Sequence, residues 1–142
     1  MGQRHDPYLS NRFLVEIDGL IVGGFSEVTG FQSELEMEEY QEGGVNHHVR
    51  RLPKGVKYPN LSLKHGITDS NVLWKWYDDV RQGTIERRTV NIICLDSQGN
   101  RKLDWQCVNA YPIKWAGPDF VAQSNNVGIE SIELTHEGIL RD

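Results

Sequence analysis

The sequence predicts a mainly β fold of the α+β class, arranged as a sandwich or a partly closed barrel with one helix. Most apolar residues alternate with polar ones over short segments, which is typical of strands that bury one face. Only one segment, residues 67 to 82, has apolar residues at helical spacing. The length of 142 residues fits one domain, which we expect to span residues 1–142.

The first predicted strands lie in the N-terminal third of the chain. FLVEI (13 to 17) alternates apolar and polar side chains, and the Asp18-Gly19 turn follows it. FSEVTGF (25 to 31) is a short strand or a bent connection. SELEMEEY (33 to 40) alternates again, which predicts another strand.

Residues 41 to 58 differ from the rest in composition, because they are rich in glycine, proline and basic side chains. We expect a long loop or a projecting hairpin, and a loop of this length is usually functional or disordered. The positive and histidine side chains are His47, His48, Arg50, Arg51, Lys54 and Lys57. These side chains fit two interpretations equally well, a loop that docks on an acidic surface of another copy or a solvated loop. Nucleic-acid binding is disfavoured, because the segment lacks the aromatic residues on which bases would stack.

The predicted helix spans residues 67 to 82. Thr68, Asp69 and Ser70 are all suitable N-cap residues. Val72, Trp76 and Val80 recur at a spacing of four, with Leu73 and Tyr77 beside them, so one side of the helix is apolar. Gly83 is well placed to end it.

The remaining predicted strands surround this helix in the sequence. LSLKH precedes it, and strands are expected at 89 to 95, 103 to 108, 110 to 115 and 129 to 136. In the last strand Ile132 and Leu134 share one face, while Ser131, Glu133 and Thr135 share the other. We expect the first face to be core and the second to meet water or a polar cavity.

The composition excludes several classes of protein. The net charge of −5 and the pI near 5.5 argue against a dedicated nucleic-acid binder. The N-terminus lacks a secretory signal pattern and no segment is apolar enough to span a membrane, so we expect synthesis in a cytoplasm without a membrane anchor. Cys94 and Cys107 lie in apolar runs and are expected to be buried thiols.

No catalytic, metal-binding or cofactor-binding motif is present in the sequence. His47 and His48 are adjacent, so an extended chain would point them to opposite faces and away from a common ion. The serines lack a nucleophile-elbow context, and the glycines match no phosphate-binding pattern. His65 and His136 have no partner that the sequence reveals. We therefore expect a protein that is not an enzyme and has no cofactor.

Several stretches together resemble the tail-tube protein family of contractile phages, R-type pyocins and extracellular contractile injection systems. The stretches are RFLVEIDGLIVGGFSEVTGF, KYPNLSLKHGITDSNVLWKWYDDV, ERRTVNIICLD, WQCVNAYPIKWAGPDF and VGIESIELTHEGI. The resemblance runs from about Arg12 to Ile139. It implies two packed antiparallel sheets with a flanking helix, and hexameric rings that stack into a rigid hollow tube.

The resemblance also implies partners and surfaces. These are further copies of the chain, a contractile sheath that drives the tube through a target envelope, baseplate and tube-terminating proteins, and cargo effectors or DNA in the lumen. Residues 41 to 58 match the loop that contacts neighbouring subunits and the adjacent ring. The outward helix face, expected to meet the sheath, comprises Trp74, Lys75, Asp78, Asp79 and Arg81. An exposed Trp74 that fills a gap between subunits is an equally good interpretation.

Two further expectations follow from the resemblance. Ser131, Glu133 and Thr135 are candidates for the lumen lining, because a polar wall lets cargo slide without sticking. The assembled protein would belong to a phage tail or a released tail-like particle of a bacterium or archaeon. A secreted hexameric ring of the type VI secretion kind, which shares the fold, is the alternative, and a small β-barrel enzyme or binding module is a second one.

Overall fold

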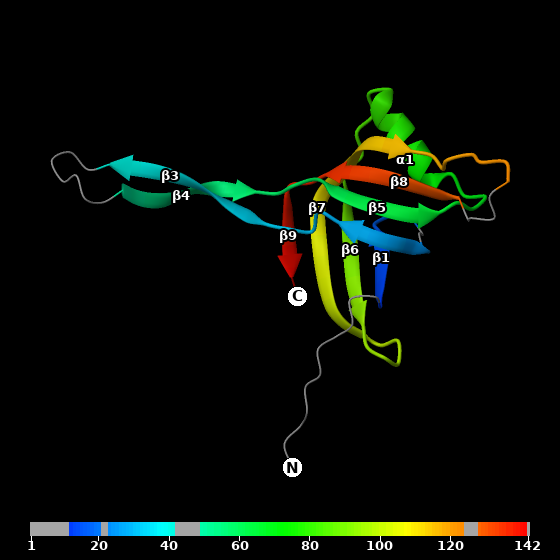
Figure 1. Ribbon diagram of the computed structural model, residues 1–142, viewed down its shortest axis with the longest axis horizontal. Coiled ribbons are helices and arrows are strands. Elements are labelled where there is room, and N and C mark those ends of the chain that lie inside the picture. The colour runs from blue at the N-terminus through cyan, green and yellow to red at the C-terminus, as the bar shows by residue number, and fades with distance from the viewer. Residues whose placement is uncertain (1–11, 21–22, 42–48, 124–127, 142) are drawn as a thin grey trace, which may run out of the picture.

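The computed structural model describes residues 12–20, 23–41, 49–123 and 128–141. It contains nine strands and one helix, so the predicted mainly β fold with one helix is confirmed (Figure 1). The strands are β1 (Phe13–Ile17), β2 (Phe25–Thr29), β3 (Glu34–Gln41), β4 (Val49–Lys57), β5 (Leu61–Gly66), β6 (Arg88–Leu95), β7 (Arg101–Ala116), β8 (Ile129–Thr135) and β9 (Gly138–Arg141). The helix, α1, is Val72–Arg81.

Two layers form the body, and β7 belongs to both. The strand order is β1-β6-β7-β8-β5-β2, with β9 paired to β7, and every pairing is antiparallel. The first part of β7 lies between β6 and β9, and its last part pairs with β8. The two layers of the sandwich are therefore one open sheet that turns a corner within β7.

Asn109 marks this corner. Sequence reasoning expected two strands, 103 to 108 and 110 to 115, but the strand runs unbroken through both. Asn109 has φ of 54°, a conformation that asparagine adopts more readily than most residues. Its side-chain amide donates a hydrogen bond to Glu137 at 2.8 Å, which ties the corner to the start of β9. The predicted break thus lies at the right residue and redirects the strand rather than ending it.

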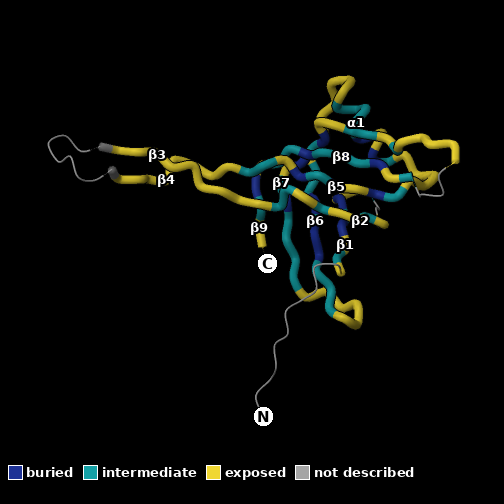
Figure 2. Tube along the Cα trace, in the orientation of Figure 1, coloured by how far each residue is buried: buried dark blue, intermediate teal, exposed yellow. Residues whose placement is uncertain are grey.

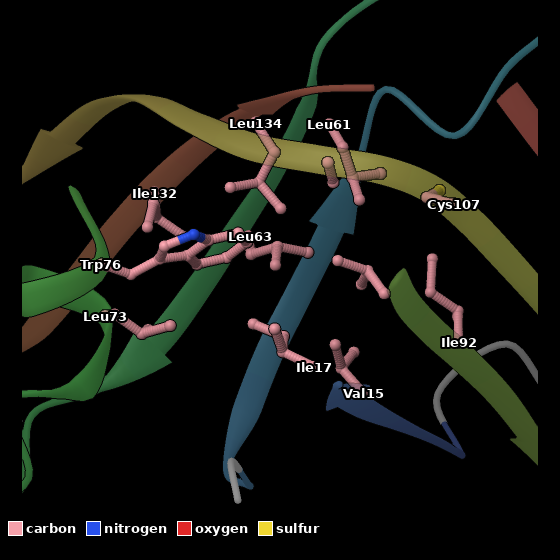
Figure 3. Packing of buried hydrophobic residues seen from close by; sticks show 12 residues of the cluster. Val15, Ile17, Leu61, Leu63, Leu73, Trp76, Ile92, Cys107, Ile132 and Leu134 are labelled. Carbon is pink, nitrogen blue, oxygen red and sulfur yellow. The ribbon is translucent and has the colours of Figure 1, made fainter. Parts of the chain in front are cut away.

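The core lies between the two layers and under the helix (Figure 3). Alternating residues of the strands supply most of it, as the period of two predicts. Ile132 and Leu134 are fully buried, which confirms the predicted inner face of β8. The other members of the cluster are Val15, Ile17, Leu61, Leu63, Leu73, Trp76, Val90, Ile92, Cys107 and Ala110.

The helix α1 begins at Val72 rather than Ile67. The Thr68 hydroxyl accepts a hydrogen bond from the backbone N–H of Ser70, which forms a local turn ahead of the helix instead of a cap. Leu73 and Trp76 are the buried residues of the helix, and the Trp76 indole donates to the carbonyl of Glu86 at 2.9 Å. Gly83 has φ of 102° and donates its N–H to the carbonyl of Val80, so it ends the helix as predicted.

The pair β3–β4 is a long hairpin that projects from the body (Figure 1). Its strands pair with each other, and with no other strand of the described residues. Figure 2 shows that its described residues are exposed along the projecting length. A two-stranded hairpin without a covered face is only marginally stable in water, so this arrangement points to contacts outside the single chain.

Candidate assembly surfaces

The basic side chains predicted for a contact loop lie on the β3–β4 hairpin. All four described cations, Arg50, Arg51, Lys54 and Lys57, are exposed on β4. Of the two structures expected for this segment, a long loop or a projecting hairpin, the structure shows the hairpin. His47 and His48 lie outside the described residues. Arg51 faces Glu39 across the hairpin at 4.0 Å, and such an exposed pair contributes little stability. These side chains are thus exposed on a part of the hairpin that an external surface can reach.

The two strands of the hairpin differ in charge. Strand β3 carries Glu34, Glu36, Glu38 and Glu39, whereas the basic residues are on β4. A bulge between Glu36 and Met37 in the pairing leaves Lys54 as the extra residue of β4. Opposite charges on opposite edges favour a partner surface that carries the same segregation.

The outward face of α1 is aromatic at one end and charged at the other. The Trp74 ring packs edge-on against Trp115 with centroids 4.8 Å apart, and against Tyr77 at 5.9 Å. Trp74 remains 38% exposed and Lys75 is exposed beside it. These two residues therefore present a surface to solvent on the side of the helix away from the core.

The charged residues of α1 are partly engaged within the helix. The Asp78 carboxylate accepts hydrogen bonds from Arg81 and from the Gln82 amide. The hydrogen bond to Asp78 raises the pKa of Arg81 above its ordinary value. Asp79 is half-buried. Of the five residues predicted for this face, Asp78 and Arg81 thus satisfy each other, while Trp74 and Lys75 are the most available.

The polar face of β8 lies opposite the core face, as its alternation predicts. Ser131, Glu133 and Thr135 are half-buried, between the fully buried Ile132 and Leu134. A shallow polar hollow of about 180 Å³ lies over this face. It is lined by Ser62, Lys114, Ala116, Ser131, Ile132 and Glu133. Lys64 of the neighbouring β5 pairs with Glu27 at 3.1 Å, so both signs of charge occur near this face.

A buried polar cluster connects the strands beneath the helix, and sequence reasoning missed it. His65 and Glu130 are 7% and 6% exposed, and their side chains lie 3.3 Å apart across β5 and β8. The second Glu130 oxygen accepts from the Trp115 indole at 2.9 Å. The other ring nitrogen of His65 contacts the carbonyl of Gly23. The sequence reveals no partner for His65, whereas the structure gives it Glu130 and the carbonyl of Gly23.

This cluster is structural rather than catalytic. Both ring nitrogens of His65 face oxygen atoms, so Glu130 and the carbonyl of Gly23 hold the imidazole from two sides. No serine, threonine or cysteine takes part in these hydrogen bonds, and buried polar groups need such partners simply to offset their lost hydration. The register of β5 and β8 produces the pair, and the sequence alone does not reveal that register.

An apolar groove of about 480 Å³ opens at the end of the body that holds the β6–β7 loop. It is lined by Phe13, Val28, Phe31, Ile92, Cys94, Leu103 and Trp105. Its floor consists of neighbouring residues on β1, β6 and β7, and Phe31 closes one side with its ring 5.7 Å from that of Trp105. An open apolar groove of this size marks a contact site more often than a plain surface.

The two cysteines are free and differ in environment. Cys107 is fully buried, as predicted, and burial raises the pKa of its thiol to about 11. Cys94 is only half-buried because it lies in the apolar groove, so its predicted burial holds in part.

Within the described residues there is no group of three or more potential metal ligands, and no helix is long and apolar enough to cross a membrane. The described chain thus offers a projecting hairpin, an outward helix face, a polar sheet face and an apolar groove. Surfaces of these kinds are suited to contacts with other protein chains.

The chain belongs to the T4-like virus tail tube protein gp19 family, whose model matches residues 9–140. It is therefore a structural tail tube protein of a phage tail or contractile injection particle and not an enzyme. None of the curated protein sequences matches it.

Solved structures of contractile particles share this fold. A chain of the anti-feeding prophage tube-terminating cap matches with a TM-score of 0.88 and 22% identity over 100% of this chain and 95% of that chain. A chain of the six-fold symmetrised anti-feeding prophage baseplate matches with a TM-score of 0.79 and 25% identity, over 97% of this chain and 97% of that chain. The third match is a chain of the sheath–tube complex of the extracellular contractile injection system PVC in its extended state. Its TM-score is 0.84 and its identity 24%, over 96% of this chain and 91% of that chain.

More distant structures share the fold as well. Hcp1 from Flavobacterium johnsoniae matches with a TM-score of 0.60 and 14% identity over 92% of this chain and 94% of that chain. Both the TM-score and the identity are lower than for the contractile particles, so the likeness to Hcp1 concerns the fold alone.

Proposed function

We propose that this protein is the subunit of an inner tube, in which hexameric rings stack into a hollow rigid tube. Contraction of a sheath drives the tube through a target envelope, and the tube conducts cargo or DNA. The observation that carries the proposal is the projecting β3–β4 hairpin, because a hairpin exposed on both faces needs neighbouring copies to cover it. Membership of the tail tube family supports the same function.

Each surface then has a role in assembly. The hairpin, with Arg50, Arg51, Lys54 and Lys57, contacts neighbouring subunits and the adjacent ring, and so do His47 and His48. The outward face of α1, chiefly Trp74 and Lys75, contacts the sheath. The polar face of β8, with Ser131, Glu133 and Thr135, lines the lumen, where exposed apolar groups would retain cargo.

The partners follow from what the related particles contain. The PVC structure holds a sheath with its tube, and the anti-feeding prophage structures hold a baseplate and a tube-terminating cap. We propose that the present chain likewise assembles with a sheath, with baseplate and tube-terminating proteins, and with cargo effectors or DNA inside. It would be made in a bacterial or archaeal cytoplasm and assembled there into a tail or tail-like particle.

The fold likeness to Hcp1 of F. johnsoniae favours a second candidate function. In that case the chain would form single hexameric rings that are themselves secreted by a type VI secretion-like system. The two candidates differ in whether rings stack stably through the hairpin.

Negative-stain electron microscopy of the purified protein over a concentration series tests both. We expect rings with an open centre that stack into tubes of constant width. Rings that never stack would favour the second candidate, and a monomer that persists at the highest concentration would contradict both. Size-exclusion chromatography with light scattering on the same samples gives the number of copies in each species.

A further inference from the structure

The apolar groove of the body is open because one layer of the sandwich is longer than the other. Figure 1 shows β1, β6 and the first part of β7 running away from the layer of β2, β5 and β8. The side chains on that uncovered stretch form two rows across the strands. Phe13, Cys94 and Leu103 are register neighbours in one row, and Ile92 and Trp105 in the next. Ile92 is already buried in the core cluster, whereas the other four are only half-buried and would normally be covered in a complete core.

The hairpin carries an apolar face that has no cover in the single chain. Leu35 and Val56 are register partners, as are Met37 and Pro53, and partners in an antiparallel pair share a face. Leu35, Val56 and Met37 are 55%, 51% and 48% exposed. Glu34, Glu36 and Glu38 alternate with them on the other face of β3.

The groove and this hairpin face lie apart within one chain. The hairpin projects away from the body, and β3 and β4 pair with no other described strand (Figure 1). The chain therefore presents a projecting apolar ridge and a separate apolar groove, and neither satisfies the other.

We propose that the groove receives the Leu35–Met37–Val56 face of the hairpin of a second copy. The proposal rests on the proposed tube function and identifies the receiving site for the hairpin. The occupant is a second copy because the same chain supplies both complementary surfaces. Docking would remove the exposed apolar side chains of both the hairpin and the groove from water, which is favourable.

Charge at the groove fits the same occupant. Arg141 of β9 lies over the Trp105 ring at 5.4 Å, and Arg12, which precedes Phe13, donates a hydrogen bond to the carbonyl of Ser97 at 3.2 Å. Neither is in an ion pair with another described residue. On β3, Glu39 shares the face of Leu35 and Met37, so its carboxylate would approach these arginines when that face fills the groove.

The contact is heterologous, since a ridge on one copy meets a groove on the next. Such contacts close into a ring or continue as a helix, and each copy uses both surfaces once. A face-to-face dimer is not what this geometry produces.

Native Cys94 provides the probe, because it lies in the groove while Cys107 is buried. We would replace Leu35 or Met37 by cysteine, and Glu36 or Glu38 as matched controls on the opposite hairpin face. Each variant is assembled, treated with a short bismaleimide, and run on a denaturing gel. We expect Leu35→Cys and Met37→Cys to link into a ladder of dimers, trimers and higher species, about tenfold faster or more than the controls.

The same variants in a Cys94→Ser background should lose the ladder, since the groove thiol is gone. Links that persist without Cys94, equal rates on the two hairpin faces, or products that stop at dimers would each overturn the proposal. Microscopy of the same samples tests the groove assignment and the tube function separately. Tubes that form without the expected ladder overturn the groove assignment alone, whereas a monomer without links overturns the tube function as well.

Discussion

Gly30 and Asn109 fix the backbone path at points where most side chains would not fit. Gly30 has φ of 83°, and a Cβ there would lie 2.0 Å from the carbonyl oxygen of Asn60. It follows β2 directly and precedes the hairpin, so it sets how the chain leaves the body. Asn109 instead uses a conformation that asparagine tolerates, and its amide holds Glu137.

Replacing Gly30 by alanine should therefore destabilise the body. The substitution combines a left-handed backbone with a clash against main chain that cannot move aside, and we expect a loss of about 2–4 kcal/mol in the free energy of unfolding. Urea denaturation followed by tryptophan fluorescence measures it. Gly66→Ala is the control, because a Cβ at Gly66 meets no atom within 4 Å, and it should change stability by less than about 1 kcal/mol. Equal losses in the two variants would contradict the close approach at Gly30.

Residue-scale contacts were the least predictable from the sequence. The alternation of Ile132 and Leu134 identified core positions, because burial of one face follows from strand geometry alone. The pair His65–Glu130 could not be found in this way, since it depends on which residues of β5 and β8 lie opposite each other. Cys94 illustrates the same limit. Its apolar neighbours predicted burial, but the length difference between the two layers leaves it in an open groove.

At the scale of the element, the helix and most strands follow from periodicity, while their ends do not. Three good capping residues, Thr68 to Ser70, predicted an early start for α1. The backbone N–H of Ile67 instead donates to the carbonyl of Gly128, which keeps this segment beside the start of β8. Strand β9 was missed because four residues are too few for a periodic pattern. Strand β4 has little periodicity because a bulge and its proline and glycine interrupt it, and pairing with β3 defines it.

The hairpin should be separable from the stability of the body. Its strands lie outside the buried cluster, and Glu34 and Lys57 are register partners, so a short linker can join them. We expect replacement of residues 35–56 by Gly-Ser-Gly to leave the free energy of unfolding within about 1 kcal/mol of the full chain. Assembly should be lost or strongly weakened in the same variant.

Urea denaturation and electron microscopy of this variant check the two halves of the expectation. A variant in which only Arg51 and Lys54 become serine controls for the loss of charge, and it should retain more assembly than the replacement does. Normal tubes from the hairpin-replaced protein would refute the role assigned to this element.

At the scale of the whole molecule, the two sides of the body differ, and in the proposed tube one would face the lumen and the other the outside. The polar face of β8 and the outward face of α1 belong to different sides of the body, because the core lies between them. A protein whose two sides differ in this way can meet cargo on one and a sheath on the other.

Thiol labelling of assembled tubes tests this orientation. In a Cys94→Ser background, Glu133→Cys should bind maleimide-coated gold inside the channel, whereas Lys75→Cys should bind it on the outer wall. Electron micrographs of end-on and side views distinguish the two positions. Gold confined to the outer wall in the Glu133→Cys tubes would exclude this face as the lumen lining, and the free cysteine Cys107 is too deeply buried to interfere.

The shared strand β7 has a mechanical consequence. Hydrogen bonds attach its first part to β6 and β9 and its last part to β8, so one covalent chain crosses from one layer to the other. Sliding one layer over the other would require breaking several of these bonds at once rather than opening them singly from an end. We expect a subunit built in this way to resist shear as a single stiff block, which the proposed tube would need if a sheath drives it forward.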